Sequence, residues 1–223
     1  MSRALALKIA SEEGQRPPAS DAPVSDLRFR ALLGDCAWQQ LPHQVRRRFE
    51  KCLATGDVVL YRGHVVSTDM SWLGRVLSWL TRPIGAPLPT MNGATGPAVV
   101  AVTEDRALGG QRWLRIYERP GRKPQMIQST KRFRGETGLE EYVGAGISMQ
   151  LVLSVENRAL VFRSRRYLFE VGRLRFPIPA LLSPGAMAIV HTQEGDGSFS
   201  FRLTLRHAVF GELLHQLALF RDV

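Results

Sequence analysis

Residues 186–206 of the 223-residue chain read AMAIVHTQEGDGSFSFRLTLR, and they carry the clearest secondary-structure pattern in the sequence. From residue 199 to residue 206, apolar and polar side chains alternate, which indicates a strand with one buried face and one solvated face. Residues 186–193 read as a second strand, and Gly195-Asp196-Gly197 supplies a turn that lets the two strands pair. The stretch therefore predicts an antiparallel hairpin.

The same kind of strand recurs along most of the chain. From residue 97 onward, glycine-bearing turns and one tight turn at Asn157-Arg158, not regular helices, separate these strands. We therefore expect antiparallel pairing and exclude a doubly wound α/β sheet. The predicted strands cover residues 58–65, 98–103, 112–118, 125–133, 147–156, 159–170, 186–193 and 199–206. Residues 211–220 fit either a helix or a strand, and we favour a strand because Phe210-Gly211 reads as a turn that folds the segment back on its neighbour.

Helical spacing of apolar residues is confined to two regions. Residues 27–49 show it with an interruption at Leu41-Pro42, which predicts two short helices. Residues 70–80 show it again, and Pro83 ends that helix. The predicted fold class is α+β and β-dominated, an antiparallel, strongly curved sheet or a partly open β-barrel with two or three short helices.

The N-terminal segment differs from the rest of the chain. Residues 11–26 hold almost no large apolar side chain and contain Pro17, Pro18 and Pro23, so they cannot bury enough surface to order. We expect residues 1–26 to be a disordered leader and residues 27–223 to form a single β-rich domain. The overall hydrophobic content of 44% is enough for one sizeable core.

Charge and cysteine content restrict the class of protein. The 30 basic and 20 acidic residues give a net charge of +10, but no recognition-helix, zinc-finger or aromatic-strand signature accompanies them, so nucleic-acid binding is not expected. We expect no transmembrane segment and no secretory signal, because the apolar stretches are short and no small-residue cleavage signature follows the first of them. Cys36 and Cys52, a lone pair without an export signal, indicate a cytoplasmic protein with ordinary buried thiols.

No catalytic, metal or nucleotide motif stands out. Residues 144–149, GAGISM, hold only the first two glycines of a dinucleotide fingerprint and lead into a strand, so they are better explained as a turn or bulge. The five histidines lack metal-ligand spacing, and no Gly-x-Ser-x-Gly nucleophile elbow is present. We therefore predict no metal, no cofactor and no assigned catalytic residue, and leave open whether the protein is an enzyme.

Short motifs are distributed over most of the chain. They are FRALLG at 29–34, LP at 41–42, KRF at 131–133, GLEEYVG at 138–144, FRS at 162–164, RFPIP at 175–179, PG at 184–185 and the segment 207–211. With these motifs, and over the whole stretch from 132 to 222, the chain resembles the bacterial DUF4166 family. That resemblance implies a compact module that stands alone or accompanies a dehydrogenase-like partner.

Six polar residues lie within otherwise apolar strands and are our candidates for a ligand-binding site. A small-molecule site is usually an apolar cavity with a few convergent polar groups. Among them, His191 follows Met187 and Ile189 at a period of two, so it should share their inner face. The candidates are Arg132, Tyr142, Tyr167, Arg175, His191 and Gln216.

Each candidate has an ordinary structural alternative. Arg175 can pair with an acidic neighbour, Glu140, Glu141 or Glu170, because polar groups within sheets usually satisfy one another. His191 can be a hydrogen-bonded core residue, and the tyrosines can contribute packing.

The helix predicted at 70–80 carries two tryptophans, Trp72 and Trp79, on an apolar face beside arginines. Such a face can pack on the core, cover the mouth of a barrel, or lie on an anionic membrane or a protein partner. We regard Trp72 and Trp79 as candidates for membrane or partner contact.

The leading functional hypothesis is a non-catalytic module that binds an apolar or amphipathic small molecule in a barrel-like cavity, with Arg175 and His191 as polar anchors. One alternative is an enzyme or accessory domain in which His191 acts as acid or base beside Tyr167 or Glu141. A further alternative is a peripheral membrane or protein-interaction module that uses the helix around Trp72.

Overall fold

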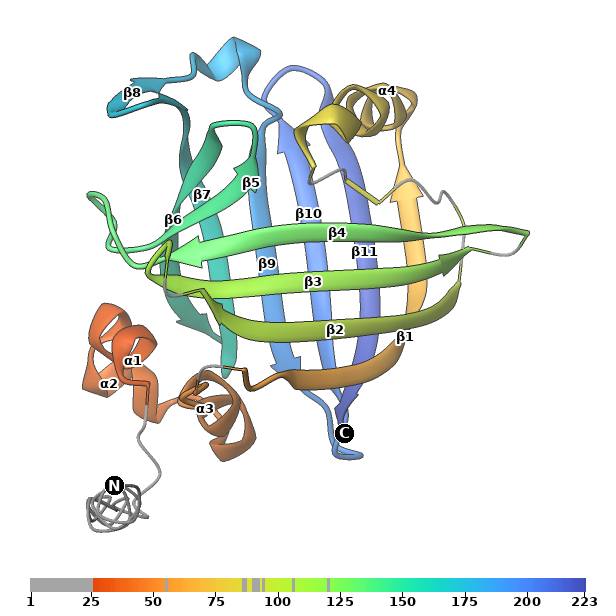
Figure 1. Cartoon of the computed structure of the whole chain (residues 1–223). Helices are drawn as coiled ribbons and strands as arrows, with labels where there is room; N and C mark the ends of the chain where they lie inside the picture. The colour runs from red at the N-terminus through yellow and green to blue at the C-terminus, as the bar shows by residue number, and fades with distance from the viewer. Residues whose placement is uncertain are drawn as a thin grey trace, which may run out of the picture.

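Ten antiparallel strands close into a barrel in the computed structural model of this chain (Figure 1). Each strand pairs with its neighbours along the chain, and pairing between the last strand and the first completes the ring. The strands are β1 (Val59–Met70), β2 (Gly96–Asp105), β3 (Gly110–Arg119), β4 (Arg122–Arg132), β5 (Glu140–Gly144), β6 (Ile147–Glu156), β7 (Ala159–Val171), β9 (Ala186–Gln193), β10 (Phe199–His207) and β11 (Gly211–Asp222).

The structure describes residues 26–54, 56–85, 88–89, 93, 95–105, 107–119 and 121–223. The predicted disordered leader therefore lies outside the described residues, except for Asp26. Asp26 is buried, and its backbone N–H donates to the carbonyl oxygen of Glu50 at 2.8 Å.

The β-dominated α+β prediction is confirmed, and the barrel is closed. Two strands were not predicted: β5, and β8 (Leu174–Pro177), which pairs with β7 outside the ring. Both are short, and β5 begins with two consecutive glutamates that hide the apolar alternation. The predicted turn at Asn157-Arg158 is present, with φ angles of 49° and 63° that suit a two-residue hairpin.

The inner face of the barrel follows the alternation expected from the sequence. On β10, Phe199 and Leu205 are buried while Arg202 and Arg206 are exposed. Burying a side chain the size of phenylalanine or leucine contributes roughly 1.5–3 kcal/mol. Many such side chains from all sides of the ring make the interior the main source of stability.

Three helices close the end of the barrel at which β1 begins (Figure 1). They are α1 (Arg28–Leu33), α2 (Asp35–Gln39) and α3 (His43–Phe49), where we expected two helices. The additional break lies at Gly34, whose φ of 77° ends α1 and is readily adopted by glycine. Phe29 is fully buried here, with its ring centroid 5.1 Å from that of Phe49.

The predicted buried role for the cysteines is wrong. Cys36 and Cys52 are both exposed and free. Helix α2 buries Trp38, and a residue two positions earlier in a helix faces the opposite side. None of the described helices has both the length and the apolar character needed to cross a bilayer.

The opposite end of the barrel is spanned by α4 (Trp72–Leu80) and the 3-10 turn η1 (Arg82–Ile84) (Figure 1). Ser71 caps the N-terminus of α4, and its hydroxyl accepts a hydrogen bond from the N–H of Gly74. Gly74 lies so close to the strand β11 that an added Cβ would come within 2.0 Å of the carbonyl oxygen of Leu213. The Ser78 hydroxyl then donates to the carbonyl oxygen of Leu88, at 3.0 Å.

Candidate functional site

The barrel encloses a cavity of about 130 Å³. Most of its lining is apolar and comes from strands on opposite sides of the ring, including Val100 on β2, Ile127 on β4 and Phe201 on β10. Leu88 and Pro89, in the segment after α4, line it as well. The interior is therefore partly open space and not filled throughout by side chains.

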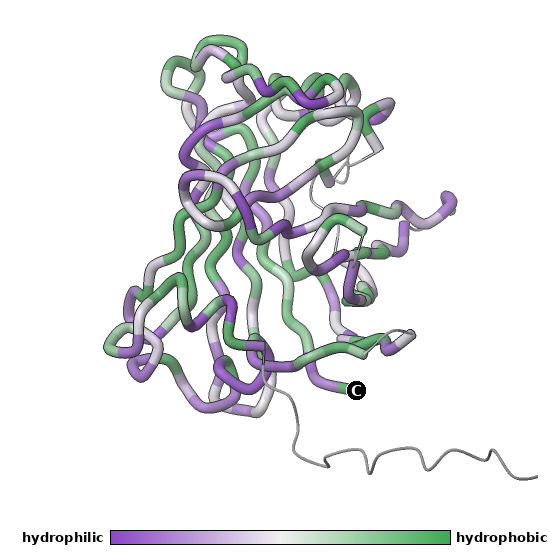
Figure 2. The backbone as a smooth tube through the Cα atoms, turned by 60° about the vertical axis from the view of Figure 1, so that its left-hand side comes forward, coloured by the Kyte–Doolittle hydropathy of each residue, from purple (hydrophilic) through white to green (hydrophobic). Residues whose placement is uncertain are grey.

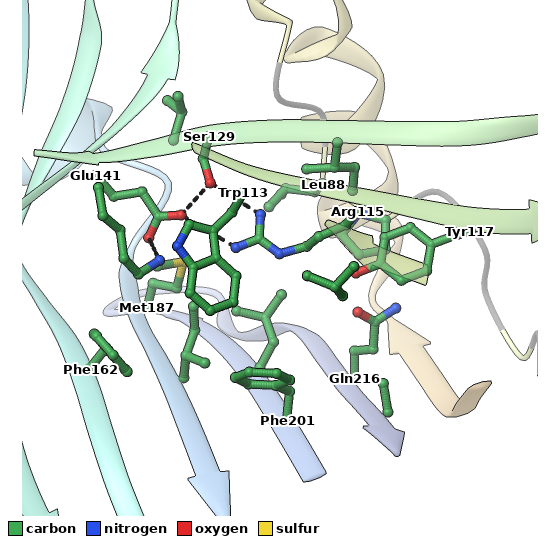
Figure 3. A pocket seen from close by; sticks show the side chains of 18 of the residues that line it. Leu88, Trp113, Arg115, Tyr117, Ser129, Glu141, Phe162, Met187, Phe201 and Gln216 are labelled. Atoms are coloured by element: carbon green, nitrogen blue, oxygen red, sulfur yellow. Dashed lines mark hydrogen bonds and ion pairs between the residues drawn. The ribbon is translucent and has the colours of Figure 1, made fainter. Parts of the chain in front are cut away.

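Four polar side chains form a connected cluster on the wall made by β3, β4 and β5 (Figure 3). The carboxylate of Glu141 accepts hydrogen bonds from Ser129 Oγ at 2.5 Å and from Lys131 Nζ at 3.2 Å. Arg115 Nη2 lies 3.5 Å from the same carboxylate, and Arg115 Nη1 donates to Ser129 Oγ at 3.1 Å. We call these four residues the inner cluster.

The strand register explains why the inner cluster forms. Lys131 on β4 lies directly opposite Glu141 on β5, and Arg132 lies directly opposite Glu140. Because successive side chains of a strand point to opposite faces, the first pair faces the cavity and the second faces outward. Charged residues that are adjacent in the sequence thus belong to two separate groups, one inside the barrel and one outside it.

Burial and neighbouring cations act in opposite directions on Glu141. Burial by itself raises the pKa of this carboxyl, but Lys131, Arg115 and the hydrogen bond from Ser129 outweigh it and lower the pKa to about 2. Burial also lowers the pKa of Lys131, against the opposing attraction of Glu141. Two basic side chains therefore share one carboxylate, in an apolar surrounding where charge is costly.

Aromatic rings complete the surroundings of Lys131. Its Nζ lies 4.9 Å from the ring centroid of Trp113 and 5.4 Å from that of Phe162, within the range of cation–π attraction. The indole Nε1 of Trp113 is buried and has no hydrogen-bond partner among the described residues. It is a further donor on a residue that lines the cavity.

Of the six predicted site residues, Gln216 lines the cavity. Its Nε2 donates to Thr68 Oγ1 at 3.0 Å across the β1–β11 pair. Tyr167 lies opposite Met149 and packs on the core, where burial raises the pKa of its hydroxyl to about 12. Tyr167 is not among the residues that line the cavity.

Arg132, Tyr142 and Arg175 lie outside the cavity in a second group of charges. Arg132 Nη1 pairs with Glu170 at 3.0 Å, and its guanidinium carbon lies 3.8 Å from the centroid of the Tyr142 ring. Arg175 pairs with Glu140, as in the structural alternative for this residue. These residues join β4, β5, β7 and β8 on the outside of the barrel, because they occupy the outward positions of their strands.

His191 points inward as its period-two spacing predicts, but it belongs to the end of the barrel that α3 covers. Its Nε2 lies 3.5 Å from Arg48 Nη1, and its ring packs against Phe49, Phe199 and Phe201. Burial, followed by the charge of Arg48, lowers its pKa to about 3.

The proposed acid–base role of His191 needs hydrogen bonds that the described residues do not make. His191 has none with Tyr167 or Glu141, and its buried Nδ1 has no partner in the described part of the chain. Its neighbours instead tie α3 to the barrel, because Arg48 also bonds to Gln193 and pairs with Asp222.

The two candidate contact residues on α4, Trp72 and Trp79, are 66% and 63% exposed. The helix instead buries Gly74 and Ser78 against the barrel. The core-packing alternative for the tryptophans therefore does not hold.

The inner cluster was missed at the sequence level, although one signal was available. Trp113, Arg115 and Tyr117 alternate on β3, and all three line the cavity. A single charged residue between two aromatic residues on the inward face of a strand indicates an internal site. The convergence of Arg115 with Glu141 depends on strand registers that the sequence alone does not fix.

Fold and site together define the class: a closed antiparallel β-barrel with a charged cluster in an apolar interior. The model of a domain of unknown function, DUF4166, matches residues 41–220, and the chain belongs to this family. Comparison with the curated proteins and with the solved structures gives no match.

Proposed function

We propose that this protein binds an amphipathic small molecule inside its barrel, with an acidic head group at the inner cluster. The observation that carries the proposal is the pairing of two basic side chains, Arg115 and Lys131, with a single carboxylate in an apolar cavity. Arg175 and His191, our anchors from the sequence, are replaced in this role by Arg115 and Lys131.

The chemistry of the cluster favours an anion. Positive charge in an apolar interior is costly unless it is paired, and an acidic head group would supply the missing counter-charge. Arg115 and Lys131 carry more N–H donors than Ser129 and Glu141 use, and charge-assisted hydrogen bonds to such donors are among the strongest in proteins. The indole N–H of Trp113, which no described residue accepts, adds a neutral donor.

The size and lining of the cavity favour a slender apolar tail. Its volume of about 130 Å³ lies below the ~300–1,000 Å³ that is usual for drug-sized ligands. The walls beyond the inner cluster include Val100, Ile127 and Leu203, and Gln216 and Tyr117 add polar groups there. A linear chain with one acidic group suits this space better than a bulky ring system.

Native mass spectrometry of the purified full chain, followed by solvent extraction, tests the proposal. We expect an acidic amphiphile bound at a stoichiometry of one. Ala218→Phe should reduce its occupancy at least tenfold, because Ala218 lines the cavity and a phenyl ring would fill it.

Leu217→Phe is the matched control, because Leu217 pairs with the exposed Arg202 on the outer face of the same strand. This variant should retain its ligand. A protein that carries no ligand and binds no fatty acid on titration, or an Ala218→Phe variant with unchanged occupancy, would contradict the proposal.

A further inference from the structure

Three segments that are far apart in the sequence bring exposed apolar side chains to the same end of the barrel (Figure 1). They are α4, the stretch from β8 to the 3-10 turn η2 (Ala180–Leu182), and the turn between β10 and β11. In Figure 2 the tube at this upper end shows green apolar stretches among purple ones. We call this surface the apolar rim; its main members are Trp72, Trp79, Phe176, Leu181, Leu182 and Phe210.

The exposure of the apolar rim is unusual for side chains of this size. Leu181 and Leu182 are 79% and 77% exposed, and Phe210 is 59% exposed. Single exposed apolar residues are common on protein surfaces, but their collection at one end of a molecule marks an interaction site. The rim also surrounds the end of the barrel that α4 and η1 span.

Basic side chains accompany the apolar rim. Arg75 and Arg82 lie on α4 and η1, Arg173 lies on the β7–β8 turn, and Arg206 lies near the end of β10; all four are exposed. Two exposed acidic residues lie at this end of the barrel, Asp69 near the end of β1 and Glu212 near the start of β11. The rim therefore carries more positive than negative charge.

We propose that the apolar rim docks on an anionic lipid bilayer. Tryptophan at a membrane interface buries its ring and keeps its N–H hydrated, and nearby arginines are attracted to anionic head groups. A second copy of the chain is less suited to this surface, because the two rims would bring like charges together. The apolar side chains also project from separate turns, which a fluid lipid surface accommodates better than a rigid protein face.

This inference is independent of the proposed ligand, because it uses only the outer surface. If the protein both binds this ligand and docks on lipid, the end of the barrel spanned by α4 faces the bilayer. An amphipathic ligand would then reach the cavity from lipid without crossing water.

Vesicle co-sedimentation of the full chain tests the docking. The vesicles are phosphatidylcholine with about 30% phosphatidylserine, and phosphatidylcholine alone. We expect binding to the anionic vesicles only, weakening at least about tenfold between 50 mM and 500 mM salt as charges are screened. Equal binding to neutral vesicles, or no dependence on salt, overturns the proposal.

Two variants of the apolar rim sharpen the test. Trp72→Ala with Trp79→Ala, and separately Leu181→Ser with Leu182→Ser, should each weaken binding about tenfold or more. All four side chains are exposed, so circular dichroism and thermal unfolding should remain as in the parent chain. The matched control is Met126→Ser, a 63% exposed apolar residue on β4 away from the rim, which should bind as the parent does.

The remaining explanation is that the apolar rim binds a second copy of the chain. Light scattering of the parent and of the Leu181→Ser, Leu182→Ser variant tests it. A monomeric parent supports docking on lipid. A parent that dimerises and a rim variant that does not would identify a second copy as the occupant and overturn the proposal. Failure of vesicle binding would leave the proposed ligand untouched, because no ligand enters this experiment.

Discussion

Buried charges give individual residues their largest effects in this protein. Glu141, Lys131 and Arg115 lie together in the interior, and His191 is buried beside Arg48 at one end. Neither site follows from residue type alone, because a buried charge costs free energy and persists only where its neighbours pair with it. Their stability effects can therefore be measured separately from any ligand.

Glu141→Gln should destabilise the fold by about 3–5 kcal/mol in urea unfolding at pH 7, because it leaves Lys131 and Arg115 without a counter-charge. The matched control is Glu156→Gln. The carboxyl of Glu156 also has a pKa lowered to about 2, by hydrogen bonds from Arg163 and Ser154, but it lies in solvent and should contribute little. Equal effects of the two variants would contradict the account.

His191 should make the fold sensitive to acid. Its pKa is lowered from 6.5 to about 3, so the unfolded chain takes up a proton as the pH falls below 6.5 while the folded chain does not. The stability that His191 contributes is thus present above pH 6.5 and declines down to about pH 3. From the size of this shift, the decline amounts to roughly 4–5 kcal/mol at most.

His191→Phe removes this proton uptake. Its free energy of unfolding should fall less steeply than that of the parent between pH 6.5 and 4, as measured by urea titration at each pH. His43→Gln, at an exposed position on α3, is the control and should follow the parent curve. Parallel curves for His191→Phe and the parent would show that His191 takes up its proton in the folded state.

Strands in which apolar and polar residues alternate strongly could be predicted from the sequence, whereas the short strands could not. The hairpin from β9 to β10 could be predicted because its apolar positions alternate without interruption. Strand β5 could not, because its outward and inward positions are both charged, at Glu140 and Glu141. Strand β5 carries Glu141, the carboxylate of the inner cluster. Without that strand, Glu141 was considered only as a partner for Arg175 or His191.

The contact of α4 with β11 predicts a specific effect of Gly74→Ala. The new methyl group would meet the carbonyl oxygen of Leu213, so α4 must shift, with a loss of about 1–3 kcal/mol in thermal unfolding. Val76→Ala alters an exposed position of the same helix and should change stability by less than about 0.5 kcal/mol. A Gly74→Ala variant as stable as Val76→Ala would mean that α4 is not held against β11.

At the scale of the whole molecule, the closed barrel separates an inner site from an outer surface. The closure follows from ten strands joined in chain order and cannot be read from any single strand, because it requires β11 to meet β1. Helices α1 to α3 cover one end, and the apolar rim surrounds the other. The sequence predicted strong curvature, whereas the cavity and the grouping of the rim depend on how distant segments meet.

Calorimetric titration with dodecanoate and with dodecanol shows whether the inner cluster binds an acidic head group. We predict that the parent chain binds dodecanoate at least about tenfold more tightly, and that Lys131→Met removes this preference while Lys123→Met, at an exposed position of the same strand, keeps it. Equal affinity of the parent for both ligands, or an unchanged preference in Lys131→Met, would contradict the claim.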